Sequence, residues 1–443
     1  MKVHLVGIGG AGMSALAHLY LERGDSVSGS DASSSAVTDA LAAAGARIAS
    51  GHDAASVGDP DLVVISTAIR DDNPELTEAR RRGIKIVLRG RAAADIAGAF
   101  REVAIAGTHG KTTTTTMTAA ALAHMDPLVL NGGRLPGSLY NSRSGHGSIA
   151  IVEADESDGS FLELTPEVGV VTNIEADHLD HYRDLGEIRR AFEMFAARIS
   201  STLVACVDDP GAAQLLAASP GDVVGYGFES ADVRAFDYEA DADGCRFRLQ
   251  TSWGGAAVRL PVTGRHNARN AMAAIAVGLA LGQPLPTLVV ALETIQLPGR
   301  RMELVAEIQG ARVYDDYGHH PTEVEATLAA AREICSGRLV CAFQPHRYSR
   351  LRAMMDAFSR AFAGADELLL LPVYGAGEAP IEGADSAALG RLVAATGKPV
   401  TVLESLEALP DALRQRLHAG DVAVCMGAGD IYKASRALSG AAA

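Results

Sequence analysis

Cysteine is scarce in this sequence, and long apolar runs are missing. The five cysteines are Cys206, Cys245, Cys335, Cys341 and Cys425. They form no C-x-x-C pair, so we predict buried, reduced thiols and no zinc site. No apolar run approaches the roughly 18–20 residues that cross a bilayer, and neither a basic segment nor a cleavage site precedes the first strand-like run. We therefore expect a cytoplasmic protein without a membrane span.

Positive charge and aromatic residues are also limited. The formal net charge is −15, which argues against binding to a nucleic-acid backbone. Aromatic residues make up 5% of the chain, against 48% hydrophobic residues and 46 glycines, a composition that suits packed α/β layers. Lysine occurs at only five positions. One of them, Lys111, lies inside a glycine- and threonine-rich segment.

The order of strand-like and helical segments predicts three α/β domains. In the first hundred residues, strands at 2–6, 26–30 and 62–66 alternate with helices, which favours a parallel sheet with crossover helices. A second unit starts at 103–106 and a third near 311. Shorter alternating segments between 221 and 262 are expected to form antiparallel strands. We place the domains at 1–97, 98–297 and 298–443.

The first glycine-rich segment, VGIGGAGMS at 6–14, satisfies G-x-G-x-x-G through Gly7, Gly9 and Gly12. Such a loop brings a helix N-terminus against a diphosphate, and Asp31 lies close to where a dinucleotide fold places its ribose-binding acid. A nicotinamide-dependent oxidoreductase is therefore one interpretation. The motif reports the diphosphate and does not identify what is attached to it.

A second phosphate loop is predicted by AIAGTHGKTTTTTM at 104–117. Gly107 and Gly110 let backbone N–H groups approach phosphate oxygens, Lys111 can reach the β- and γ-phosphates, and a threonine hydroxyl can bind Mg²⁺. The strict Walker pattern would have glycine in place of Ile105, so this is a tighter variant. The predicted nucleotide-binding residues are Gly107, Thr108, His109, Gly110, Lys111, Thr112 and Thr113.

Polar residues follow two strand-like runs beside this loop. The segment IVEADESDGSF ends in Glu153, Asp155, Glu156 and Asp158, and TNIEADHLDHY contributes Asn173, His178, Asp180 and His181. Carboxylates at strand ends next to a phosphate loop suit Mg²⁺, although each cluster alone could be a solvated loop. Together they favour a metal–nucleotide site.

Four further segments carry candidate ligand-binding residues, each with a structural alternative such as helix capping or surface polarity. They are GRHNARNAMAA with His266, Asn267 and Asn270; LPGRRMELV with Arg300 and Arg301; VYDDYGHHPTEV with Asp315, Asp316, Tyr317, His319 and His320; and FQPHRYSRLR with His346, Arg347 and Arg350.

These motifs, in this order along almost the whole chain, resemble the Mur ligases of bacterial cell-wall synthesis. The resemblance implies a Rossmann-like N-terminal domain for a UDP-sugar, a central P-loop ATPase-type domain, and a Rossmann-like C-terminal domain for an amino acid. It also implies ATP and Mg²⁺. The expected reaction joins L-alanine to the lactyl carboxylate of UDP-N-acetylmuramate through an acyl phosphate, in a monomer or homodimer.

The resemblance also assigns roles to residues. Thr112 and Glu153 would hold Mg²⁺, with Glu156 as the alternative to Glu153, and His178 would hold or orient a second ion. The remaining assignments are Lys111 and Arg301 to the transferring phosphate, Asn270 and His266 to adenine, Asp316 to the ATP ribose, His319, Tyr317 and Arg347 to the amino acid, Gly7, Gly9, Gly10 and Gly12 to the sugar diphosphate, and Asp31 to the uridine end.

One feature of several Mur ligases is missing, and two other activities stay open. A carbamoylated lysine beside the second metal cannot form, because no lysine occurs between Lys111 and Lys398.

Within the family, an enzyme that adds an intact tripeptide to the same sugar is an alternative, although GIGGAGMS favours the alanine-adding activity. A nucleotide-dependent binding protein without turnover is the other alternative.

Overall fold

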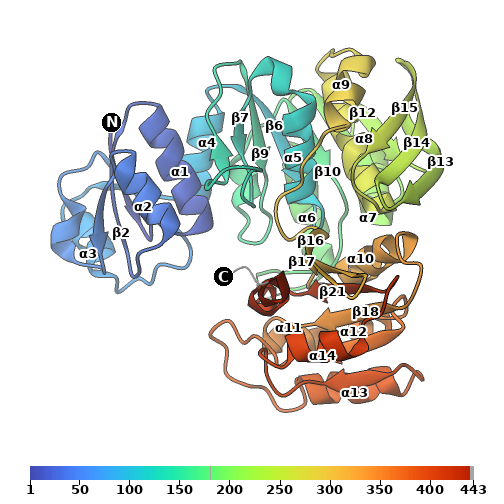
Figure 1. Ribbon diagram of the computed structural model, residues 1–443. Coiled ribbons are helices and arrows are strands. Elements are labelled where there is room, and N and C mark those ends of the chain that lie inside the picture. The colour runs from blue at the N-terminus through green and yellow to red at the C-terminus, as the bar shows by residue number, and fades with distance from the viewer. Residues whose placement is uncertain (180, 440–443) are drawn as a thin grey trace. The chain divides into compact units, whose positions relative to one another are not determined.

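The computed structural model describes residues 1–179 and 181–439 (Figure 1). Three sheets, of five, ten and six strands, carry the chain, and helices connect most of their parallel strands, which confirms the α/β class. The chain divides into two compact units: Met1–Asp237, Phe247–Arg259 and Arg269–Pro298 form the first, and Tyr238–Arg246, Leu260–Ala268 and Gly299–Ala443 form the second. The domain limits at 97 and 297 remain predictions.

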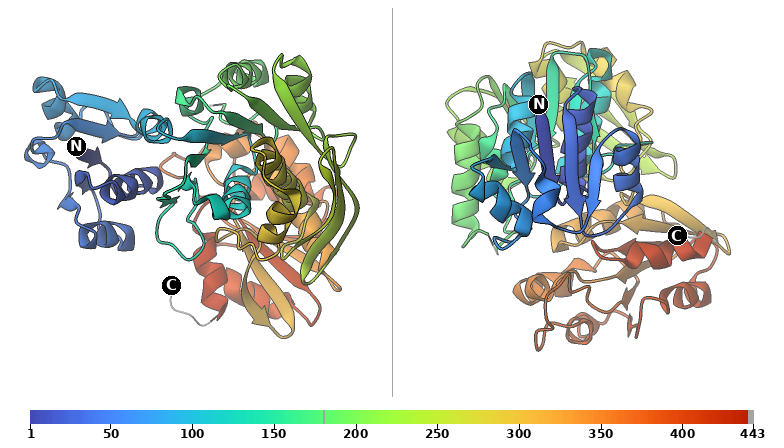
Figure 2. Two further views of the ribbon diagram at one scale, coloured as in Figure 1. Left: turned by 90° about the horizontal axis from the view of Figure 1, so that it is seen from above. Right: turned by 90° about the vertical axis from the view of Figure 1, so that its left-hand side faces the viewer.

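The first sheet is parallel, with strand order β3-β2-β1-β4-β5 (Figure 2, right, in blue). Its strands are β1 Lys2–Val6, β2 Ser26–Asp31, β3 Arg47–Ser50, β4 Leu62–Ile65 and β5 Lys85–Leu88; its helices are α1 Ala11–Glu22, α2 Ala36–Ala43, α3 Pro74–Arg81 and α4 Arg89–Ala97, with a 3-10 turn at Ala54–Val57. Because β1 is central, its residues Val3–Val6 are fully buried. The carboxyl end of β1 therefore leads directly into the first glycine loop.

The second sheet has the order β15-β14-β13-β12-β11-β10-β6-β9-β7-β8. Its strands are β6 Arg101–Ala106, β7 Leu128–Leu130, β8 Ser142–Arg143, β9 Ile149–Glu153, β10 Val168–Val171, β11 Thr202–Cys206, β12 Asp222–Gly227, β13 Val233–Asp241, β14 Gly244–Thr251 and β15 Gly254–Leu260. Its helices are α5 Lys111–Ala121, α6 Leu185–Ala196, α7 Pro210–Ala218, α8 Arg265–Ala280 and α9 Leu285–Leu292, with 3-10 turns at Ala123–Met125 and Ser160–Glu163. Strand β6 lies between β9 and β10, so the ends of these three strands lie together.

The stretch between 221 and 262 is only partly as expected. Strands β13, β14 and β15 are joined by two-residue turns, and neighbouring strands so connected can pair only in antiparallel fashion. The expectation was wrong for the first strand of the stretch, since β12 pairs in parallel with β11 after the crossover helix α7. This strand extends the parallel sheet before the hairpins begin.

A buried carboxyl at the start of β6 should make the stability of the protein depend on pH. Glu102 is 3% exposed, and burial raises its pKa to about 7. The folded state therefore favours the protonated form, and its stability decreases as the pH rises from about 4.5 through 7, by up to about 3 kcal/mol. We expect Glu102→Gln to be more stable than the wild type at pH 8 and similar to it at pH 5, as measured by urea unfolding.

Glu167→Gln is the matched control for this experiment. Glu167 is also a carboxyl at this end of the sheet, but its pKa is lowered by hydrogen bonding to Arg101. Its replacement should not stabilise the protein at pH 8. An unchanged pH dependence in Glu102→Gln would contradict the prediction.

The third sheet has the order β16-β17-β21-β18-β19-β20, and β16 alone is antiparallel to its neighbour. Its strands are β16 Glu303–Ile308, β17 Ala311–Asp316, β18 Leu339–Phe343, β19 Glu367–Leu370, β20 Val400–Val402 and β21 Val422–Met426. The helices are α10 Pro321–Glu333, α11 Tyr348–Ala353, α12 Met355–Ala361, α13 Ser386–Ala394, α14 Leu409–Arg416 and α15 Ile431–Arg436, with a 3-10 turn at Ala437–Ser439. Apolar clusters cover both faces of this sheet. The carboxyl ends of β17 and β18 lead into the predicted polar turns.

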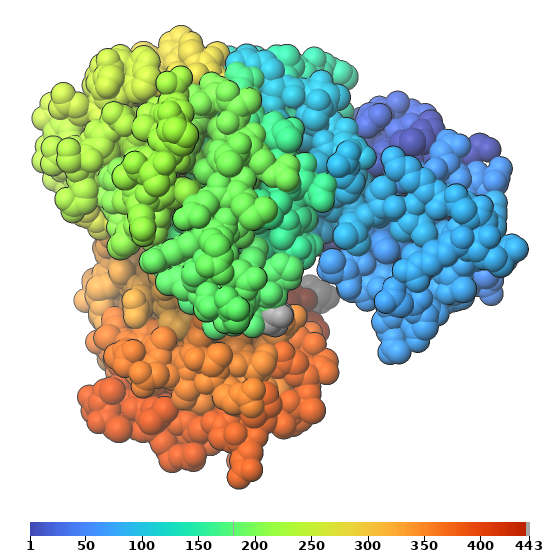
Figure 3. All heavy atoms as spheres, turned by 180° about the vertical axis from the view of Figure 1, so that it is seen from behind, coloured from blue at the N-terminus to red at the C-terminus, as the bar shows by residue number. Residues whose placement is uncertain are grey.

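The prediction of buried thiols is confirmed for Cys206, Cys245, Cys341 and Cys425 and is wrong for Cys335, which is partly exposed. Arginines at the end of α3 pair with nearby acids, Arg80 with Asp71 and Arg81 with Glu78. Figure 3 shows the residues of the first sheet, in blue, from behind. None of the described helices is long and apolar enough to cross a membrane.

Candidate active site

The first glycine loop is held by the end of β2. Gly7 has φ +74°, a conformation that favours glycine, and both Gly7 and Ile8 donate their backbone N–H to the Ser30 carbonyl at 2.9 Å. The Gly9 N–H donates to Asp31 Oδ2 at 2.8 Å. Asp31 therefore orients the loop itself, and its predicted contact with the uridine end remains a prediction.

A buried polar network holds the end of β2, to which the first glycine loop is hydrogen-bonded. The Ser30 hydroxyl donates to Glu75 Oε1 at 2.7 Å, and His4 Nε2 lies 2.6 Å from Glu75 Oε2. His52 Nδ1 lies 2.7 Å from the same carboxylate. Burial opposes ionisation of Glu75, but its hydrogen bonds to His4, Ser30 and His52 outweigh burial and lower its pKa. None of these polar residues carries a motif in the sequence.

The second glycine loop connects β6 to α5. Gly107 has φ +135°, and a Cβ placed on it would lie 1.9 Å from Thr172 Oγ1. Gly110 caps α5 in the left-handed region, with φ +83°. The Asn173 side chain accepts from the His109 N–H at 2.8 Å and donates to the His109 carbonyl at 3.0 Å. Asn173, which the sequence placed in a metal cluster, thus shapes the loop backbone.

Lys111 folds over the loop toward the acids that follow β9. Its Nζ donates to the Gly107 carbonyl at 2.7 Å and to Glu156 Oε1 at 2.8 Å. Burial alone would lower the pKa of Lys111, but the charges of Glu156, Asp155 and Glu153 outweigh it and raise this pKa. Burial in turn raises the pKa of Glu156 to about 7. The Lys111 ammonium thus lies at the glycine loop, where it could neutralise the charge of a nucleotide phosphate.

Oxygen donors gather beside this lysine. Thr112 Oγ1 donates to Glu153 Oε1 at 3.2 Å, and the Gly132 N–H donates to Glu153 Oε2 at 2.6 Å. Burial raises the pKa of Glu153 as well. His178 Nε2 lies 3.6 Å from Glu156 Oε1. This set of a hydroxyl and carboxylates, partly buried at Thr112 and Glu153, fits a hard divalent cation such as Mg²⁺. Asp180, predicted for the same strand end, lies outside the described residues.

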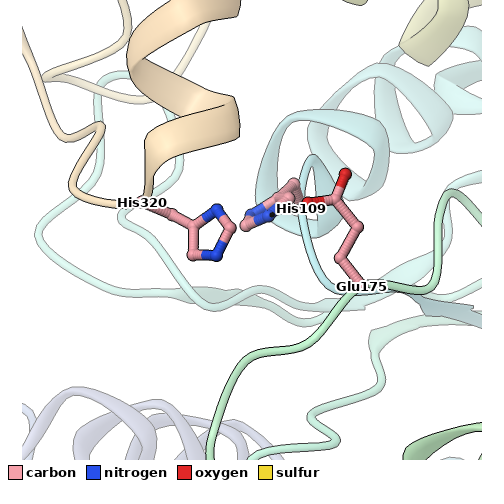
Figure 4. A group of neighbouring side chains, drawn as sticks. All are labelled: His109, Glu175 and His320. Carbon is pink, nitrogen blue, oxygen red and sulfur yellow. Dashed lines mark ion pairs between the residues drawn. The ribbon is translucent and has the colours of Figure 1, made fainter. Parts of the chain in front are cut away.

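His109, in the second glycine loop, and Asn270, on α8, also have polar contacts at this loop. His109 Nε2 forms an ion pair with Glu175 Oε2 at 3.6 Å (Figure 4). On α8, Asn270 Oδ1 accepts from Thr114 Oγ1 at 3.2 Å and lies 2.9 Å from where a Cβ on Gly110 would be. The predicted adenine residue Asn270 therefore packs directly against the phosphate loop.

His266 and Asn267 lie at the start of α8, in the second unit. The Asn267 side chain donates to the Thr263 carbonyl at 2.8 Å, whereas the side chain of a helix N-cap accepts from a backbone N–H, so this bond is not a helix cap. The His266 ring lies against Gly264, where a Cβ would approach its Cε1 to 2.6 Å. One helical turn separates His266 from Asn270, so α8 carries both predicted adenine residues.

The turn after β17 is built around two buried aspartates. Asp316 accepts from the Gly318 and Met302 N–H groups at 2.8 and 2.9 Å, and burial raises its pKa against the charge of Arg301. Asp315 Oδ2 accepts from Arg300 Nε at 3.1 Å. The Arg300 and Arg301 guanidinium carbons lie 5.1 and 5.5 Å from the Tyr317 ring centroid. Asp316 thus shapes the turn, and its predicted ribose contact is untested.

Aromatic rings continue from this turn to the end of β18. The His319 ring lies 5.3 Å from Tyr317 and 5.8 Å from His346, which stacks on Tyr374 at 5.6 Å. Burial, with Arg350 and Arg347, lowers the pKa of His346 to about 4. The Arg347 N–H donates to the Tyr374 carbonyl at 2.8 Å. The structure thus brings Tyr317, His319 and Arg347 into one group. Tyr374, which no sequence motif indicated, belongs to the same group.

One histidine and two arginines of these segments have a positive backbone φ. His178, Arg300 and Arg347 have φ of 53°, 62° and 65°. Non-glycine residues in this region are strained, and such strain concentrates at functional sites. His320, in contrast, is the N-cap of α10, in a capping box with Glu323.

Family models match the chain in three successive segments. They are the Mur ligase family catalytic domain at 2–101, the Mur ligase middle domain at 105–278, and the Mur ligase glutamate ligase domain at 300–429. Together they span both glycine loops and the polar turns of the third sheet.

Individual proteins match over nearly the whole length. The UDP-N-acetylmuramate–L-alanine ligase of Xanthomonas oryzae pv. oryzae (strain PXO99A) is 48% identical, over 97% of this chain and 93% of that protein. The crystal structure of the UDP-N-acetylmuramate–alanine ligase of Thermotoga maritima is 31% identical, with TM-score 0.83, covering 99% of this chain and 98% of the other. A murein peptide ligase structure from Psychrobacter arcticus 273-4 is 26% identical, with TM-score 0.70, covering 99% and 98%. This chain belongs to the Mur ligase family.

Proposed function

We propose that the protein is an ATP-dependent ligase that joins L-alanine to the lactyl carboxylate of UDP-N-acetylmuramate, in the synthesis of peptidoglycan precursors. The observation that carries the proposal is that relatives 47–48% identical over nearly the whole chain bear the name of this activity. Two separate glycine loops, on two sheets, support it. A nicotinamide oxidoreductase would leave the Lys111 loop and its acids without a use. A tripeptide-adding enzyme is less well supported, since the murein peptide ligase named above is only 26% identical.

The chemistry follows from the poor reactivity of a carboxylate toward an amine. In-line attack of the lactyl carboxylate on the γ-phosphate of ATP breaks the bond to the bridging oxygen, releases ADP and gives an acyl phosphate. Lys111 would neutralise the charge that develops on the transferring phosphoryl group. The Lys111 Nζ donates to Glu156 Oε1 at 2.8 Å, so a bound phosphate would compete with this carboxylate for the ammonium.

Mg²⁺ would be held by Thr112 and Glu153, with Glu156 as the alternative carboxylate and His178 near a second ion. When bound, it would neutralise phosphate charge. The residues around it keep the oxygen donors together: the Gly132 N–H orients Glu153, and Lys111 balances Glu156.

In the second unit, Arg347 would bind the carboxylate of L-alanine, with Tyr317 and His319 beside it. Arginine suits a carboxylate because its guanidinium offers paired donors. Attack of the alanine amine on the acyl phosphate then releases phosphate. The contacts proposed for Arg301, Asp316 and His266 with ATP, and for Gly7, Gly9, Gly10 and Gly12 with the sugar diphosphate, complete the assignment.

The proposal is tested by ADP release with UDP-N-acetylmuramate and each of L-alanine, glycine, L-serine and the tripeptide L-Ala-γ-D-Glu-meso-diaminopimelate. We expect the highest kcat/KM with L-alanine. Release only with the tripeptide would support the alternative enzyme. No sugar-dependent release with any acceptor would reject the ligase assignment.

We also predict that activity does not depend on bicarbonate. Carbamoylation needs a lysine, and none lies between Lys111 and Lys398. Turnover measured in CO₂-depleted buffer should therefore equal turnover after bicarbonate is added, within experimental error. A severalfold activation by bicarbonate would contradict this prediction.

We further propose a cytoplasmic location, where ATP and nucleotide sugars are available, and a monomer or homodimer. Gel filtration with light scattering would determine the oligomeric state.

A further inference from the structure

Arg89, the first residue of α4, lies between the first glycine loop, called the sugar loop from here on, and the acids that follow β9. A Cβ built on Gly12 would lie 2.7 Å from Arg89 Cδ and 3.0 Å from its Nη1. On its other side, Arg89 Nη2 lies 3.4 Å from Asp155 Oδ2 and 3.3 Å from Asp158 Oδ2. The third glycine of the motif thus makes room for a guanidinium. All of these residues belong to the first compact unit.

The ion pairs of Arg89 are loose. A strong arginine–carboxylate pair is bidentate, with distances of about 2.7–2.9 Å. Arg101 and Glu167 form such a pair, at 2.7 and 2.8 Å. Arg89 reaches both of its aspartates through one nitrogen and at longer range, and within residues 1–179 and 181–439 its Nε and Nη1 have no hydrogen-bond acceptor. It remains 29% exposed, so most of its donor capacity is available to a ligand.

The surroundings on the loop side favour an anion. The loop leads into the N-terminus of the twelve-residue helix α1, and the backbone N–H groups of a first helical turn carry partial positive charge. On the other side, Asp155 is close enough to Lys111 to raise the pKa of that lysine. Arg89 therefore lies between the first glycine loop, which it contacts at Gly12, and Asp155, with which it pairs.

We infer that Arg89 binds an anionic group of UDP-N-acetylmuramate, exchanging its loose ion pairs with Asp155 and Asp158 for that group. The inference rests on the proposed function, since it takes the substrate from there. The group is either the diphosphate or the lactyl carboxylate, which offer the same anionic oxygens. Arg89 would thereby position the substrate between the two loops.

The test is isothermal titration calorimetry of the whole protein, without ATP, using UDP-N-acetylmuramate and UDP-N-acetylglucosamine. We expect Arg89→Ala to weaken the binding of UDP-N-acetylmuramate by about ten- to a hundredfold, as for the loss of a hydrogen-bonded charge. An equal loss with UDP-N-acetylglucosamine, which has no carboxylate, assigns the diphosphate. A loss confined to UDP-N-acetylmuramate assigns the carboxylate. Unchanged affinity for both ligands would overturn the inference.

Two further variants separate ligand binding from a purely structural role. Asp158→Asn removes one of the two ion pairs of Arg89 but leaves the guanidinium in place, so affinity should stay equal or rise. A loss like that of Arg89→Ala would show that the pair is structural and would overturn the inference. Arg91→Ala is the matched control, because Arg91 lies on the same helix and pairs with Asp95 and Glu163. Its affinity should be unchanged.

Failure of this inference is distinguishable from failure of the proposed function. If the wild type binds UDP-N-acetylmuramate and turns it over while Arg89→Ala binds equally well, only the role of Arg89 is rejected. If the wild type neither binds nor turns over this sugar, the proposed function is rejected together with the inference.

Discussion

Lys111→Ala is expected to reduce kcat by about 10³-fold or more while the Kd for UDP-N-acetylmuramate stays within about twofold. The reason is the placement of the ammonium: it lies on the phosphate loop after β6, whereas the sugar loop follows β1 of a different sheet. Kcat from ADP release and Kd from calorimetry are the two measurements.

Lys85→Ala is the matched control, since Lys85 is an exposed lysine on β5. It should leave both quantities unchanged. Because Lys111 balances buried acids, its loss also lowers stability, so urea unfolding must show that the variant is folded. Equal losses of sugar affinity and turnover would contradict the separation of the two loops.

Gly107→Ala is expected to destabilise the protein by several kcal/mol, about 3 or more, and to abolish ATP binding. Two costs add together. The backbone has φ +135°, and the new Cβ would overlap Thr172 Oγ1 and approach the Thr172 and Asn173 backbone nitrogens to 3.0 and 3.1 Å. Since the loop backbone forms the phosphate site, any shift that relieves the overlap also displaces its N–H groups.

Gly24→Ala isolates the cost of the backbone conformation. Gly24 has φ +79° and no atom within 4 Å of the position of a Cβ. Its replacement should cost only about 1–2 kcal/mol and leave ATP binding intact. Urea unfolding and nucleotide titration measure both effects, and equal stability losses in the two variants would show that steric overlap at Gly107 contributes nothing.

The features that sequence predicted best are those that impose a residue type. Gly7, Gly107 and Gly110 occupy backbone conformations that favour glycine, so both loops are visible as motifs. The order of buried strands likewise leaves apolar runs, and the α/β class follows from them. The strand β16 is not predicted from the sequence, because it is a mostly exposed or half-buried edge strand that carries the acidic residues Glu303 and Glu307.

Tertiary partners explain what the sequence did not predict. Arg89 is an ordinary arginine at the start of a helix until the fold brings Gly12 and Asp158 to it. Tyr374 lies far along the chain from Tyr317 and joins the aromatic group only through the pairing of β18 with β19. Asn173 looks like a metal ligand in a strand-end cluster, and only the structure shows its side chain bonded to the His109 backbone.

The left-handed backbones of His178, Arg300 and Arg347 have a consequence for directed evolution. Each position would be relaxed by glycine or asparagine, which tolerate positive φ better than histidine or arginine do. A library selected only for heat resistance should therefore accumulate these two residues at the three positions. Such variants would have a higher melting temperature and a lower ligase activity. This trade-off arises where side chains with a proposed role lie on strained backbone.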